Sequence, residues 1–384
     1  MKSIYLDNAA TSQVRDEVID KMSAVLKSNY GNPSSMHGYG RSSKSIIENC
    51  RKRIASHFNA LSSEIVFTAG GTEADNLVLC SAVRDLNVTH IITSKIEHHA
   101  VLHTVEQLAV AYKIDVSYVD VLANGTLDYQ HLETLLKSTK KTLVSLMHVN
   151  NEIGTILDLQ KVADLCQSNG ALFHSDSVQS VGHYHLDLKT TPVDFLAASA
   201  HKFHGPKGIG FVFIRKNSGL KPLIIGGTQE RGVRAGTESI HDIVGLDESL
   251  ALSYQNLASE KTYVKGLKSY FVDQLKAQIP DLKFNGSCCD PEISTYTLVN
   301  VCLPVSEADA PMFLFQLDLK GIACSKGSAC QSGSGKSSHV LAEILSEEDL
   351  KKPSIRFSFS IYNTKKEIDT VVDTLAELIN VTVS

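Results

Sequence analysis

The chain has 384 residues, of which 43% are hydrophobic and 21% are charged, and its net charge at pH 7 is −5. This length favours two domains, and the composition is ordinary for a globular protein. Nucleic-acid binding needs clustered Lys and Arg, so the acidic balance argues against a nucleic-acid partner. We find no apolar run as long as a signal peptide or a membrane span, and we expect a cytoplasmic protein without membrane contact.

Short apolar runs alternate with helix-like segments between about residues 60 and 215. The runs that we predict as buried strands are 65–68, 90–93, 142–147, 171–174, 194–197 and 209–214. Segment 160–169 has helical spacing and ends before Gly170, a residue typical of helix ends. This alternation predicts an α/β fold with a mostly parallel sheet.

The pattern changes after about residue 255. A long amphipathic helix is predicted over 260–278, strands over 296–302 and 354–358, and a closing helix over 365–378. These elements predict a second, smaller α+β domain. Segment 325–338 is rich in Gly and Ser, and we expect it to be a mobile loop.

Lys202 follows an apolar strand and precedes Gly205 and Gly208. A lysine at a strand end can be desolvated and so become a Schiff-base former. Ser199 and His201 lie close enough in sequence to reach a phosphate beside it. The alternative is a surface lysine in a turn.

Asp176 and Gln179 follow the strand predicted over 171–174 and can face one site from positions i and i+3. A carboxylate that pairs with a pyridinium nitrogen keeps a cofactor ring electron-withdrawing, and Gln179 can donate to a phenolic oxygen. The alternative is that Asp176 caps a helix.

Gly70, Gly71 and Thr72 stand between a strand and a helix-like run, where backbone N–H groups can approach a phosphate. His98 follows the strand that ends near residue 94, and an imidazole there can stack on a planar ring or carry protons. A structural histidine is the alternative. Since no second cluster has ligand spacing, we predict no metal site.

Asn150 and Asn151 follow another strand, at the edge where open α/β sheets bind ligands, although Asn is also common in turns. Arg356 alternates with apolar residues on a strand, so it needs a partner. That partner is either a substrate carboxylate or a structural carboxylate.

Eight cysteines are present, and reduced thiols are expected. Cys330 lies in the Gly/Ser-rich segment, where burial does not account for it and where Lys326 and Lys336 favour a thiolate. The vicinal pair Cys288 and Cys289 is a rival reactive site whose role stays open.

Taken in order, several motifs resemble the cysteine desulfurases. These are the NifS/IscS-like branch of the class V aminotransferase family, which are fold-type I enzymes dependent on pyridoxal phosphate (PLP). The motifs are YLDNAAT (5–11), GNPSSMH (31–37), GGTEADN (70–76), EHHAV (97–101), HVNNEIG (148–154), DSVQSVG (176–182), SAHKFHGPKGIG (199–210), RAGTES (234–239), GSAC (327–330) and SIRFS (354–358). The resemblance covers nearly the whole chain. It departs from the family at Gly71, where Ala is usual, and we expect no effect because a backbone contact needs no side chain.

The resemblance implies a large PLP-binding domain at 14–255 with a mostly parallel seven-stranded sheet. It implies a small domain formed by 1–13 and 256–384, which carries the cysteine loop at about 325–338. It also implies a homodimer whose sites lie near the subunit interface.

The resemblance further implies roles for individual residues. Lys202 would hold PLP and Cys330 would accept sulfur. The residues that would bind the ring are His98, Asn151, Asp176 and Gln179. Those that would bind its phosphate are Gly71, Thr72, Ser199, His201 and, from the neighbouring subunit, Thr237. Those that would hold the substrate carboxylate are Asn32, Asn151 and Arg356.

The implied activity is removal of sulfur from L-cysteine, which gives L-alanine and a persulfide for a protein acceptor. An iron–sulfur scaffold and a tRNA-thiolation protein are both open as acceptors. The alternatives are a selenocysteine lyase, a class V aminotransferase without need of Cys330, and a sulfur-handing binding partner with slow turnover of its own.

Overall fold

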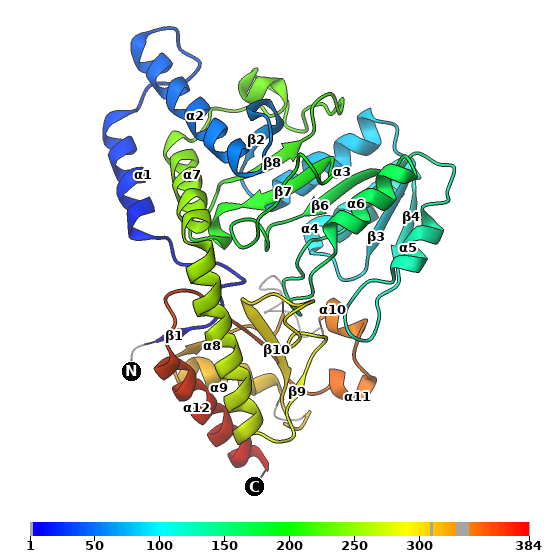
Figure 1. The fold of residues 1–384 in the computed structure, drawn as a ribbon, viewed down its shortest axis with the longest axis vertical. Coiled ribbons are helices and arrows are strands. Elements are labelled where there is room, and N and C mark those ends of the chain that lie inside the picture. The colour runs from blue at the N-terminus through cyan, green and yellow to red at the C-terminus, as the bar shows by residue number, and fades with distance from the viewer. Residues whose placement is uncertain (1–2, 308–309, 328–337, 384) are drawn as a thin grey trace.

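A seven-stranded sheet forms the centre of the larger part of the computed structural model, which describes residues 3–307, 310–327 and 338–383 (Figure 1). The strand order is β2-β8-β7-β6-β5-β3-β4. The bounds are β2 Ile65–Thr68, β3 His90–Ser94, β4 Asp115–Val119, β5 Thr142–Ser145, β6 Leu172–Asp176, β7 Phe195–Ser199 and β8 Gly210–Ile214. Strand β8 runs antiparallel to its neighbours β2 and β7, whereas the other pairs in this sheet are parallel. The predicted α/β fold with a mostly parallel sheet is confirmed.

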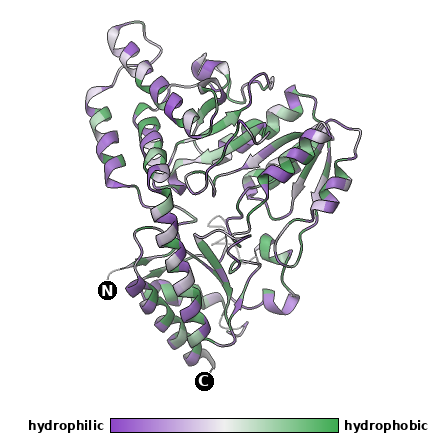
Figure 2. Ribbon diagram, viewed as in Figure 1, coloured by the Kyte–Doolittle hydropathy of each residue, from purple (hydrophilic) through white to green (hydrophobic). Residues whose placement is uncertain are grey.

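Helices cover both faces of this sheet because its strands are apolar on both sides. In β2, Ile65 and Phe67 belong to one hydrophobic cluster and Val66 to another. The first cluster includes residues of α2 (Gly38–His57), α6 (Leu159–Ser168) and α7 (Ile240–Gln255), and the second includes residues of α3 (Gly71–Asp85) and α4 (His99–Tyr112). Figure 2 shows the hydrophobic colouring concentrated on the strands and on the inner sides of the helices. Helix α1 (Asp16–Ser28) packs on α7, and α5 (Tyr129–Leu135) packs beside β4.

A second, three-stranded antiparallel sheet lies below the first in Figure 1, in the order β12-β10-β9. Its bounds are β9 Lys283–Phe284, β10 Leu298–Cys302 and β12 Ser354–Ser358. The helices of this region are α8 Leu257–Gln278, α9 Ala310–Leu319, α10 His339–Ala342, α11 Glu347–Leu350 and α12 Lys365–Val383. A separate hydrophobic cluster holds it together, with Phe271 of α8 against Phe357 of β12 at a ring-centroid distance of 5.0 Å. This is the α+β region that the sequence predicts.

The N-terminal strand joins the C-terminal region. Strand β1 (Ile4–Tyr5) pairs in parallel with β11 (Ile322–Ala323), and Leu6 belongs to the same hydrophobic cluster as Phe271. The exact domain boundaries at residues 13/14 and 255/256 stay a prediction.

Several element ends differ from those that the sequence predicts. Strand β6 continues to Asp176 and β7 to Ser199, so each ends on a residue with a proposed chemical role. Strand β5 ends at Ser145 rather than at 147. The edge strand β4 is absent from the sequence-based prediction because its residues are mostly half-exposed and Asp115 and Ser117 interrupt its apolar residues.

None of the helices in the described part of the chain is long and apolar enough to cross a membrane. Among the same residues, no group of three or more His, Cys, Asp or Glu side chains is arranged to hold a metal ion.

Candidate active site

Five segments with predicted chemical roles meet at one edge of the large sheet. Strands β2, β3, β5, β6 and β7 run in the same direction, so their carboxyl ends lie together. Asp176 and Ser199 are the last residues of β6 and β7, and the 3-10 helix η2 (Ala200–Lys202) follows β7 directly. Open α/β sheets bind ligands at this edge.

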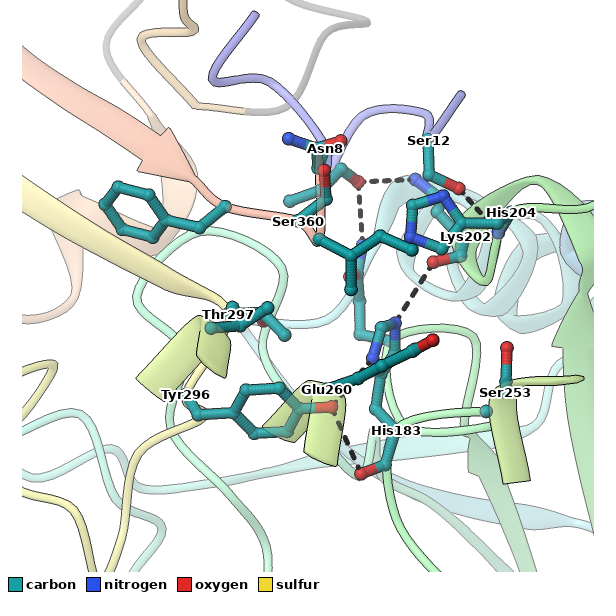
Figure 3. A pocket seen from close by; sticks show the side chains of 16 residues that line it. Asn8, Ser12, His183, Lys202, His204, Ser253, Glu260, Tyr296, Thr297 and Ser360 are labelled. Atoms are coloured by element: carbon teal, nitrogen blue, oxygen red, sulfur yellow. Dashed lines mark hydrogen bonds between the residues drawn. The ribbon is translucent and has the colours of Figure 1, made fainter. Parts of the chain in front are cut away.

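Lys202 is half-buried, and its side chain points at the N-terminal segment (Figure 3). Its Nζ donates hydrogen bonds to Ala9 O at 2.7 Å and Ala10 O at 2.9 Å. The Nε2 of Gln179 donates to the same Ala9 carbonyl at 2.9 Å. Lys202 is therefore no solvated surface lysine, and it converges with Gln179 on one backbone oxygen.

Asp176 is buried, and its Oδ1 accepts a hydrogen bond from Val178 N at 3.0 Å. Residues 178–183 form turns, so Asp176 does not cap a helix. Burial raises the pKa of Asp176, while the Val178 N–H and the charge of Lys202 act in the opposite direction. A cation near this carboxyl would stabilise its ionised form.

His98 is the N-cap of α4, and its Nδ1 accepts a hydrogen bond from Ala100 N at 3.1 Å. Burial, reinforced by the charge of Lys202, lowers the pKa of His98 to about 4. The ring is therefore neutral near pH 7, with its proton on Nε2. A neutral imidazole at this edge suits stacking on a planar group.

The N-terminus of α3 lies beside the end of β7. A Cβ built on Gly71 would lie 2.5 Å from Val178 Cγ2 and 3.9 Å from Ser199 Cβ, so these three residues touch. Helix α3 has no side-chain cap, which leaves its first N–H groups for another acceptor. Thr72 is exposed in the first turn of α3. The Nδ1 of His201 is buried and has no hydrogen-bond partner among the described residues, as expected where a polar ligand would bind.

Arg356 is 1% exposed and is paired within the chain. Its NH2 donates to Asp7 Oδ1 at 2.8 Å and its NH1 to Asn151 O at 2.7 Å. The structural ion pair that the sequence left open is thus present, and a substrate carboxylate would have to share this guanidinium with Asp7. The structure brings Arg356 and Asn151 together.

Asn32 and Thr237 lie apart from the other predicted site residues. Asn32 is exposed between α1 and α2, where its Oδ1 accepts a hydrogen bond from Ser34 N at 2.9 Å. Thr237 is exposed between the 3-10 helix η3 (Gln229–Gly232) and α7. No hydrogen bond within the described ranges joins either residue to the rest, and their predicted roles stay untested in a single chain.

Cys330, and with it most of the loop predicted over 325–338, lies outside the described residues. The chain on each side of this gap is anchored at the site. Ser325 exchanges two backbone hydrogen bonds with Arg356, at 2.7 and 3.3 Å, and Ser338 Oγ donates to Glu152 Oε2 at 2.5 Å. Of the rival pair, Cys288 is buried and Cys289 is exposed.

The sequence missed several residues of the site. Asp7, Ala9 and Ala10 lie in the motif YLDNAAT, whose residue types alone predict no chemical role. A pocket beside Lys202 is lined in part by His183, Glu260 and Tyr296 (Figure 3). The ring of His183 lies between Lys202 and Tyr296, with Nε2 3.1 Å from Lys202 O and Nδ1 3.1 Å from Tyr296 Oη. For Asp7, Ala9 and Ala10 the only signal in the sequence is the motif itself, and His183, Glu260 and Tyr296 lie outside it.

Residues 4–371 match the family model described as Aminotransferase class-V. Two similar proteins are the "Putative cysteine desulfurase IscS 1" of Bacillus subtilis, 40% identical with 99% of each chain covered, and the "Cysteine desulfurase IscS" of Dictyoglomus turgidum, 39% identical with 98% of this chain and 95% of that protein covered.

Two similar solved structures agree with this match. One is described as "NIFS-LIKE PROTEIN" and has a TM-score of 0.89, 32% identity, and coverage of 98% of this chain and 99% of that chain. The other, "SspA in complex with cysteine", has a TM-score of 0.78, 30% identity, and coverage of 94% and 100%. The chain therefore belongs to the class V aminotransferase family, in its NifS/IscS-like branch.

Proposed function

We propose that this chain is a PLP-dependent cysteine desulfurase, which takes sulfur from L-cysteine, releases L-alanine and carries the sulfur as a persulfide on Cys330. The observation that carries the proposal is the convergence of Lys202 and Gln179 on Ala9 O, at the sheet edge where buried Asp176 ends β6. Similar full-length proteins named as cysteine desulfurases support the same activity.

The donor set at the sheet edge fits PLP. The uncapped N-terminus of α3 and the unpartnered His201 Nδ1 suit a phosphate dianion. Buried Asp176 suits a ring N–H cation, and the neutral ring of His98 suits stacking. When bound, PLP supplies an electron-withdrawing ring that stabilises negative charge developing at the substrate's α-carbon.

Each predicted residue then has a chemical task. Lys202 would hold the cofactor through Nζ and, once the amino group of L-cysteine has taken its place, would move the proton at the substrate's Cα. Asp176 would hold the ring nitrogen proton, and Gln179 would donate to the phenolic oxygen. The phosphate would be bound by Gly71, Thr72, Ser199, His201 and the partner subunit's Thr237.

The substrate carboxylate would be held by Arg356, together with Asn151 and Asn32. Because Arg356 NH2 is bonded to Asp7, the incoming carboxylate must displace Asp7 or share the guanidinium with it. A bidentate Arg–carboxylate pair is strong enough to compete for these donors.

Sulfur transfer would occur between two sulfur atoms. The thiolate of Cys330 would attack the sulfur of L-cysteine, so that an S–S bond forms and the substrate C–S bond breaks. The electron pair of that C–S bond stays on the substrate carbon, which becomes protonated to give L-alanine. The persulfide would then pass to a protein acceptor, either an iron–sulfur scaffold or a tRNA-thiolation protein. A homodimer and a cytoplasmic location belong to the same proposal.

The test compares L-alanine and sulfide release from L-cysteine, with a thiol reductant, among the wild type, Cys330→Ala and Lys202→Ala. Absorbance near roughly 420 nm reports the bound cofactor. We expect the wild type to be coloured and active, Cys330→Ala to stay coloured but lose release, and Lys202→Ala to lose both. Full activity of Cys330→Ala would instead favour a selenocysteine lyase or an aminotransferase.

A further inference from the structure

Two ionisable side chains that the proposed chemistry does not use are buried beneath the candidate site. Asp75 is 1% exposed and His174 is 0% exposed. The Nε2 of His174 lies 3.4 Å from Asp75 Oδ1, and its Nδ1 lies 2.9 Å from Ser145 Oγ. The sequence pattern assigns no function to this pair.

The backbone places this pair next to the predicted cofactor residues. His174 and Asp176 are two residues apart on β6, so their side chains share one face of the sheet. Helix α3 packs on β6 and β7, and Asp75 lies one turn after Gly71 on the same side of that helix. Asp75 thus connects the phosphate end of the site to the strand that carries Asp176.

The buried groups Asp75, Glu97, Asp176 and His174 include three carboxyl groups and one imidazole. Burial raises the pKa of Asp75, and the charges of Asp176 and Glu97 raise it further. Burial also lowers the pKa of His174 to about 3, so this ring adds no positive charge near pH 7. Lys202 is the cation whose charge reaches Asp176.

Two polar atoms of the Asp75–His174 pair also lack good hydrogen bonds. Asp75 Oδ1 and His174 Nε2 are both buried, and neither makes a well-formed hydrogen bond within the described residues. Buried carboxyl groups close to one another are costly unless a cation or a shared proton lies among them. A protonated ring nitrogen beside Asp176 would supply that cation.

We infer that Asp75, which lies beside His174, is a positioning residue that supports Asp176, so that the two carboxyl groups together keep a protonated pyridine nitrogen bound. The inference rests on the proposed function, since it concerns the cofactor of that site. In this proposal Asp75 acts through Asp176 rather than on the ring. A negative charge that supports Asp176 from within the protein raises the proton affinity of the ring nitrogen.

The test uses the full-length protein loaded with PLP that carries ¹⁵N in its ring. The ¹⁵N chemical shift is followed from about pH 6 to about pH 9, and the dissociation constant of PLP is measured alongside. Asp75→Asn keeps the shape of the side chain but removes its ability to ionise. Asp247→Asn is the matched control, because Asp247 is equally buried but lies on α7, paired with Arg53.

We expect the wild type and Asp247→Asn to keep the ring nitrogen protonated over this range. In Asp75→Asn the pKa of the ring nitrogen should fall by about 1–3, which brings its titration into the range and weakens PLP binding about tenfold or more. His174→Gln should shift the titration less and in the same direction, and it replaces Asp75→Asn if that variant does not fold. A ¹⁵N titration unchanged in both variants would overturn the inference and leave the proposed function intact. A wild type that does not bind PLP would overturn both.

Discussion

A methyl group added at Gly71 is expected to destabilise the protein through one contact. The Cβ of alanine would lie 2.5 Å from Val178 Cγ2, whereas ordinary contacts are 3.4–4 Å. Val178 is β-branched and cannot turn away easily, so the overlap must be relieved by moving the backbone, at a cost of about 1–3 kcal/mol. Replacing glycine by alanine in a helix returns at most about 1 kcal/mol. The net loss for Gly71→Ala is therefore up to about 2 kcal/mol.

Thermal denaturation of the apo-protein measures this loss, with a decrease in Tm of about 1–2 °C for each kcal/mol. The double variant Gly71→Ala/Val178→Ala provides the control, because it removes the methyl group that collides. We expect the two changes to couple favourably by at least about 1 kcal/mol in a double-mutant cycle. PLP affinity should fall in Gly71→Ala and recover in the double variant, since Gly71 contributes backbone to the phosphate site. Additive effects within about 0.5 kcal/mol would refute the argument that Val178 fills the place of a Cβ at position 71.

Three further predictions concern buried charges. Burial raises the pKa of Glu97 from 4.5 to about 8. The folded apo-protein thus holds a proton that the unfolded chain releases, and its stability should fall between about pH 4.5 and 8 by up to roughly 5 kcal/mol. Glu97→Gln should flatten the plot of Tm against pH between about pH 4.5 and 8. A plot that is the same as that of the wild type would contradict this assignment of the proton to Glu97. Arg356→Lys should raise the KM for L-cysteine about 10–100-fold, with a smaller effect on kcat, because lysine lacks the two parallel donors of the guanidinium group. An unchanged KM would show that Arg356 pairs only with Asp7 and does not bind the substrate. Glu230→Gln leaves Arg51 without its buried partner and should cost about 3–5 kcal/mol in chemical denaturation, whereas a cost below about 1 kcal/mol would show that the pair is not needed.

The large sheet could be predicted because burial on both faces makes its strands visible as apolar runs. Six of its strands were found in this way, each within a few residues of the observed bounds. Strand β4 was missed because an edge strand needs apolar residues on only part of its surface. Asp176 was expected after β6 rather than within it, since polar residues end an apolar run before they end a strand.

The candidate site could be predicted where it depends on strand ends and failed where it depends on tertiary contacts. Asp176 ends β6, and Gln179 and Lys202 follow β6 and β7, which run in the same direction, so their proximity follows from the sheet. Asp7 pairs with Arg356 across 349 residues of sequence, a contact that periodicity does not reveal. The acceptors for Lys202 are backbone carbonyls at Ala9 and Ala10, and a carbonyl leaves no signature in the sequence.

The most direct test of the proposed function is to find where the sulfur of L-cysteine is held after one turnover without a reductant. The protein is digested, and each cysteine peptide is analysed by mass spectrometry for the addition of one sulfur atom. We predict the added sulfur on Cys330, with Cys288, Cys289 and Cys324 unmodified. Added sulfur on another cysteine, or L-alanine released without any persulfide on Cys330, would contradict the account.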